Sequence, residues 1–89
     1  MPYTPTYIST ATTTVVRSTP GVLFSITVTG GTAGTIIVYD NATAASGTIL
    51  ASFGSTNAIQ TYIFDVTAEK GVTVITSAAT QLTVSSGVV

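Results

Sequence analysis

Only five side chains of this sequence carry a formal charge, and they limit the chemistry that the chain can perform. The five are Arg17, Asp40, Asp65, Glu69 and Lys70. The chain has no His and no Cys, so it lacks the usual general base, the commonest metal ligand and any thiolate nucleophile. A conventional active site needs several such groups in one place. We therefore expect a protein that is not an enzyme, with no catalytic residues, no cofactor and no metal site.

Two carboxylates still deserve comparison with known chemistry. Asp40 and Asp65 each end a strand-like segment after an aromatic residue, in the pairs Tyr39-Asp40 and Phe64-Asp65. Paired carboxylates can perform acid/base work or bind Ca²⁺. The sequence has no Asp-x-Asp loop, and an Asp at a turn accepts hydrogen bonds from backbone N–H groups two or three residues on. We favour turn capping for both, and the sequence leaves open whether either binds a cation.

The glycine-rich segment 30–34, Gly-Gly-Thr-Ala-Gly, superficially resembles a phosphate-binding loop. Such a loop needs a Lys and a following helix, and neither is present. Because two adjacent glycines supply the positive φ angles of a tight hairpin, the segment predicts a plain hairpin turn.

The charge balance excludes several classes of partner. Two basic residues cannot neutralise a nucleic-acid backbone, so we expect no nucleic-acid binding. No polybasic run suits an anionic membrane surface, and no 18-residue apolar stretch exists, so we expect no membrane association. Residues 1–20 have no basic n-region and no apolar run typical of a signal peptide, so none is expected.

Low charge and many β-branched residues distinguish the composition. Charged residues make up 6% of the 89, against about 25% in a typical domain, and the net charge is −1. Copies of such a chain repel one another only weakly, which is typical of assembly subunits. The sequence has 20 Thr, 11 Val and 8 Ile, which suit a pleated sheet better than a helix. These features predict an all-β subunit of an assembly.

Alternating segments separated by turn residues predict about seven short strands, a spacing that suggests a sandwich or small barrel. We expect one antiparallel β-sandwich over residues 15–89. The predicted strands are Thr12–Arg17, Val22–Thr29, Thr35–Asp40, Thr48–Phe53, Ile59–Val66, Val72–Thr76 and Gln81–Ser85. The clearest alternation predicts a core face of Val22, Phe24, Ile26 and Val28. The strand Thr35–Asp40 is apolar on both faces, so we expect it to be central or covered on both sides.

Residues 1–14 predict an extended N-terminal arm outside the sandwich. Pro2 and Pro5 cannot sit in a central strand, and no side chain of the segment is charged. We expect Tyr3, Tyr7 and Ile8 to anchor the arm on a neighbouring subunit, the alternative being a frayed terminus. Two further interface candidates are cations, with a surface role as the alternative: Arg17 and Lys70.

A resemblance rests on three parts of residues 21–85, about three quarters of the chain. They are the glycine-led strand Gly21–Thr29, the strand end Tyr39-Asp40-Asn41 with Ser46-Gly47-Thr48, and Lys70-Gly71-Val72. With these features the chain resembles small all-β virion proteins of tailed bacteriophages, close to head-decoration (capsid cement) proteins. These motifs are structural, so they specify the fold better than the role.

The resemblance implies a β-sandwich or jelly-roll subunit, usually trimeric, on the outer surface of the capsid. Its partners would be the major capsid protein and further copies of itself, and it would be made in the host cytoplasm. The resemblance brings no catalytic residues. The alternative is a tail or fibre module that binds a carbohydrate or receptor, because similar modules occur in tails and fibres.

Overall fold

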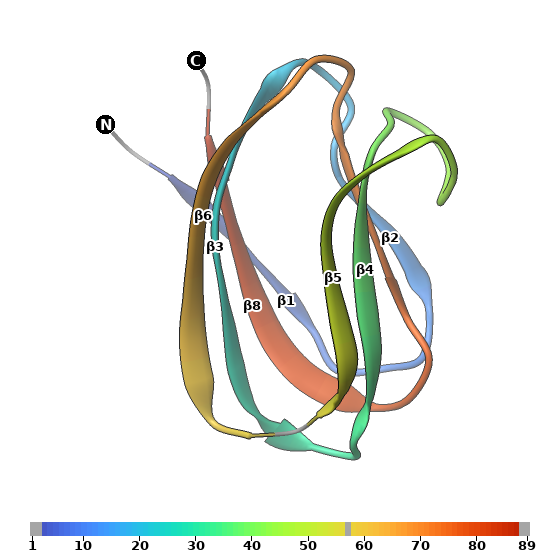
Figure 1. Ribbon diagram of the computed structural model, residues 1–89, viewed down its shortest axis with the longest axis vertical. Helices are drawn as coiled ribbons and strands as arrows, with labels where there is room; N and C mark the ends of the chain where they lie inside the picture. Colours follow the sequence, from blue (N-terminus) through green and yellow to red (C-terminus); the bar gives the residue numbers. More distant parts are fainter. Residues whose placement is uncertain (1–2, 57, 88–89) are drawn as a thin grey trace.

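The structure is a computed structural model that describes residues 3–56 and 58–87, apart from the side chain of Thr56. Within these residues it contains eight strands and no helix (Figure 1). The strands are β1 (Thr4–Ile8), β2 (Thr13–Arg17), β3 (Gly21–Gly31), β4 (Gly34–Asp40), β5 (Thr48–Thr56), β6 (Gln60–Ala68), β7 (Val72–Thr76) and β8 (Thr80–Gly87). The same part of the chain has no helix that could cross a membrane.

The strands form two antiparallel sheets of four. Sheet A has the order β1-β8-β3-β6, and sheet B has the order β2-β7-β4-β5. The pairs β4–β5, β3–β6, β2–β7 and β1–β8 follow one another outward from a single hairpin. This long hairpin is rolled up, so that β3 also pairs with β8 and β4 with β7. The result is the eight-stranded jelly-roll arrangement, and the predicted antiparallel sandwich is confirmed.

The core lies between the two sheets and is built from every second residue of most strands. β4 shows the pattern, because Ile36 and Val38 are fully buried while Ile37 and Tyr39 are half-buried on the opposite face. The buried apolar residues are Ile8, Leu23, Ile26, Val28, Ile36, Val38, Ala51, Ala68, Val72, Val74, Leu82 and Val84. All seven predicted strands are present.

The additional strand, β1, which was not among the seven predicted, corrects the prediction of a separate arm. Residues 4–8 are extended, but they pair with β8 of the same chain from Thr4 opposite Ser86 to Ile8 opposite Leu82. Ile8 is 4% exposed and belongs to the core. Pro5 is compatible with this place because β1 is an edge strand, where a missing N–H is tolerated.

The predicted core face of β3 is correct in its second half and wrong in its first. Ile26 and Val28 are fully buried, but before them Leu23 is buried instead of Val22 and Phe24, which are both half-buried. The pairing of β3 with both neighbours shifts by one residue between Leu23 and Ser25. A bulge at this point reverses which side chains face inward.

Asp65 lies at this irregularity and not at a strand end as predicted. It is inside β6, at a bulge where the two residues Phe64 and Asp65 lie opposite the single residue Phe24 of β3. Its φ is 53°, a left-handed conformation that Asp adopts more readily than most residues.

The segment 30–34 turns the chain with positive φ at Gly30 (132°) and Gly31 (81°), as predicted. It is not a hairpin, however, because β3 belongs to sheet A and β4 to sheet B. The two glycines therefore make a crossing between the sheets.

Candidate protein–protein interface

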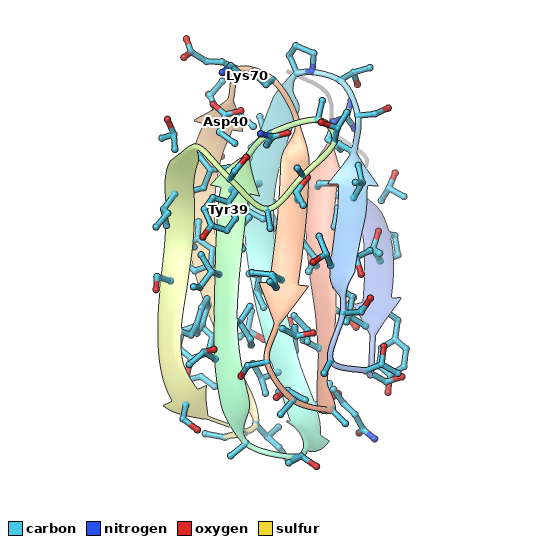
Figure 2. The ribbon with its side chains drawn as sticks, turned by 90° about the vertical axis from the view of Figure 1, so that its right-hand side faces the viewer. Tyr39, Asp40 and Lys70 are labelled. Carbon is cyan, nitrogen blue, oxygen red and sulfur yellow. The ribbon has the colours of Figure 1, made fainter. Side chains whose placement is uncertain are left out.

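The four strands of sheet B place apolar side chains in two rows on the face turned away from sheet A. One row runs Val15–Thr73–Tyr39–Ile49 and the other Thr13–Ile75–Ile37–Ser52. In Figure 2 this sheet faces the viewer, and Tyr39 is labelled on β4. We call the surface made by Val15, Ile37, Tyr39, Ile49 and Ile75 the B face.

The B face is unusual for the outside of a sandwich. Outward positions of an antiparallel sheet are commonly polar, whereas five of the eight residues in these rows are apolar and neither row contains a charge. Ile49 is 52% exposed and Val15 is 43% exposed, and the other three are half-buried. Covering exposed apolar area stabilises a complex by about 25 cal/mol per Å² before association costs. The B face therefore suits a protein partner.

The loop 41–47 lies over Thr73, in the middle of one row of the B face, and hydrogen bonds hold it there (Figure 2). Thr73 lies on the outer side of β7 yet is fully buried, and its hydroxyl donates to the Asn41 carbonyl at 2.8 Å. The Asn41 Oδ1 accepts from the backbone N–H groups of Thr43 at 2.9 Å and Ala44 at 3.0 Å. The Asn41 amide nitrogen donates to the Ser46 carbonyl at 3.1 Å. A partner on the B face would thus also contact the loop 41–47, which these hydrogen bonds hold in place.

Asp40 fixes the end of β4 at the same edge. Its carboxylate accepts from the backbone N–H groups of Lys70 at 2.8 Å, Glu69 at 3.0 Å and Gly71 at 3.4 Å (Figure 2). Burial raises the pKa of Asp40, but these three donors, Lys70 first, and the Lys70 charge together hold it below its ordinary value. The carboxylate caps backbone N–H groups as predicted, but across the sandwich and not within its own turn.

Within the described residues, no group of three or more His, Cys, Asp or Glu side chains could hold a metal ion. No cavity was found in that part of the molecule either. The three backbone donors on Asp40 give its carboxylate a structural role, because they tie the end of β4 to the connection 69–71.

The interface candidates from the sequence lie apart. Tyr3 stacks on Phe24 of sheet A with ring centroids 4.3 Å apart. Ile8 is in the core, so the expectation that it anchors on a neighbour is wrong. Arg17 donates to the hydroxyl of Thr19 at 3.0 Å, within its own turn.

Tyr7 and Lys70 stay exposed, Tyr7 by 59%. The outer face of sheet A around Tyr7 is mainly hydroxylated. Tyr7 is opposite Thr83, which is opposite Thr27, which is opposite Thr61. The hydroxyls of Thr27 and Thr61 are 3.1 Å apart and share a hydrogen bond. Next to this row, Ile63 is 68% exposed.

The sequence indicated only part of the B face. The second apolar face of the strand Thr35–Asp40 pointed to Ile37 and Tyr39. Val15, Ile49 and Ile75 join them only through the strand register, which the turns and bulges determine.

Comparisons with protein-family models, curated proteins and solved structures found no match for this chain.

Proposed function

We propose that this chain is a structural virion protein, a decoration or cement subunit that binds the outer surface of a phage head. The observation that carries the proposal is the uncharged, apolar B face on a small jelly roll. A low charge and a resemblance over residues 21–85 to head-decoration proteins support it. The partner is the major capsid protein, and no catalysis is involved.

The mechanism is burial of protein surface across the seams between capsid subunits. A subunit that binds the mature lattice more tightly than its precursor shifts the equilibrium toward the mature lattice, by mass action. The hydrogen-bonded loop 41–47 and its Asp40 support lower the entropy cost of a contact between copies on the B face, because they are ordered before binding.

The proposed oligomer is a homotrimer. The B face lies within the plane of the longest and shortest dimensions of the molecule, 31 and 17 Å, so its area is below roughly 500 Å² (Figure 2). A standard interface needs about 800 Å² from each partner. In a closed ring of three each copy meets two neighbours, which increases the area buried per copy. A trimer also matches the local three-fold positions of an icosahedral shell.

The test is binding to heads of the phage that encodes the chain. Purified protein should co-sediment with mature heads lacking it, saturate at a fixed number of copies per capsid subunit, and raise the temperature at which the heads open. Precursor heads should bind less. A protein that stays in the supernatant with mature heads would contradict the proposal.

One observation favours the alternative, a tail or fibre module that binds a carbohydrate or receptor. Tyr7 is exposed beside the hydroxyls of Thr83 and Thr27, and sugars bind aromatic rings flanked by hydrogen-bonding groups. A glycan array separates the two proposals, because specific binding that Tyr7→Ala abolishes would favour the alternative.

A further inference from the structure

The charges of the molecule are distributed unequally between its two ends. Arg17 ends β2, Asp40 ends β4, and Glu69 and Lys70 connect β6 to β7. These points, with the start of β1 and the end of β8, lie at the upper end in Figure 1. Asp65 is three residues before the end of β6 at this same end. We call it the charged end.

Among the described residues, the opposite end has no charged side chain. It consists of the connections 9–12, 32–33, 58–59 and 77–79, and its residues are Ser, Thr and Ala apart from Ile59. Ile59 is 79% exposed, the highest value among the exposed large hydrophobic residues described. We call this surface the neutral end.

Buried threonines hold the neutral end in place. The Thr76 hydroxyl donates to the Thr10 carbonyl at 2.6 Å and accepts from the Thr12 N–H at 3.1 Å. The Thr76 N–H also donates to the Thr12 carbonyl at 3.0 Å. On the other side of the end, the Thr80 hydroxyl donates to the Thr32 carbonyl, and the Thr32 N–H donates to the Ala79 carbonyl at 3.0 Å.

Two glycines bring these connections close together. A Cβ on Gly31 would lie 2.5 Å from the Ala79 carbonyl oxygen, and one on Gly34 would lie 2.6 Å from the Ala78 Cβ. The connections 9–12, 32–33 and 77–79 therefore form a close-packed surface of small side chains, which loses little conformational entropy on docking.

We infer that the neutral end is the surface that docks on the capsid shell, with the charged end turned toward water. This inference rests on the proposed function. Moving a charge out of water is costly unless it is paired, so the end without charges is the one that a protein shell covers at least cost. Ile59 supplies an exposed apolar side chain for a pocket on the shell. The B face remains available for contacts between neighbouring copies.

A matched pair of substitutions tests the orientation. Ala33 and Ser18 are small, exposed loop residues at the neutral and charged ends, respectively, and Ser18 lies outside the loop 41–47. Ala33→Glu should weaken binding to mature heads by at least about tenfold, because docking would bury an unpaired charge. Ser18→Glu should leave binding within about twofold of wild type, within the usual effect of surface substitutions. Ile59→Ser should also weaken binding, and all three should melt near the wild-type temperature.

Other outcomes separate the inference from the function on which it rests. If Ser18→Glu weakens binding and Ala33→Glu does not, the orientation is reversed and the proposed function survives. If both variants bind like wild type, docking uses neither end and the inference is wrong. If Ala33→Glu changes the oligomeric state of the free protein, the neutral end contacts a second copy instead. If the wild-type protein does not bind heads, the proposed function is wrong, and the inference that rests on it is wrong as well.

Discussion

At the scale of single residues, Asp40 does the most to fix the structure beside the B face. Replacing it with Asn removes the negative charge to which three backbone N–H groups donate. Hydrogen bonds to charged groups contribute about 1.5–3 kcal/mol to the free energy of unfolding. Asp40→Asn should lower the free energy of unfolding at neutral pH by about 2 kcal/mol. Urea unfolding measures this. Asp65→Asn is the matched control, because it removes the same charge from an exposed residue and Asn also tolerates positive φ.

The lowered pKa of Asp40 gives the same prediction a pH dependence. Its folded-state pKa is below the ordinary value of 3.8, so its contribution to stability is fully present above about pH 5. It is lost as the pH falls through the ordinary value and then through the folded-state pKa. The stability difference between wild type and Asp40→Asn should therefore shrink on acidification. A difference that stays constant down to pH 2 would contradict this role of the carboxylate.

At the scale of elements, β1 decides whether the N-terminal segment belongs to the fold. Ile8 is 4% exposed, while its neighbour Tyr7 is 59% exposed. Ile8→Ala should cost about 2–5 kcal/mol of stability, as for other buried Ile residues, and Tyr7→Ala about 0.5 kcal/mol or less. Denaturant unfolding of the two variants makes the comparison. Equal stabilities would mean that β1 does not pack on the sandwich in solution.

The strands themselves were predictable, because β-branched residues alternate between turn signals along residues 12–85. The strand β1 was not, since Pro5 argues against a central strand and the sequence does not show which strands are edges. The inward direction of the Leu23 side chain could not be predicted either. The alternation from Val22 to Val28 continues through a bulge that depends on β6 and β8, which are distant in sequence. For the same reason, only the β4 part of the B face could be found.

At the scale of the whole molecule, the four edge strands discourage assembly through strand pairing. β1 contains Pro5, and the pairing of β2, β5 and β6 with their neighbours is interrupted by register shifts. Prolines and bulges are the usual means of protecting sheet edges. Copies of this chain should therefore associate through faces, and the B face is the uncharged apolar one.

Ile49→Glu tests this mode of association. Ile49 is 52% exposed, so the variant should fold, but it puts a charge on the B face that contact with a neighbour would bury. Light scattering at micromolar concentration should give a trimer for wild type and a monomer for Ile49→Glu. Ile63→Glu is the control, because Ile63 is 68% exposed on sheet A, outside the B face, and this variant should remain trimeric. A wild-type monomer, or a trimer that only Ile63→Glu dissociates, would show that the B face does not join the copies.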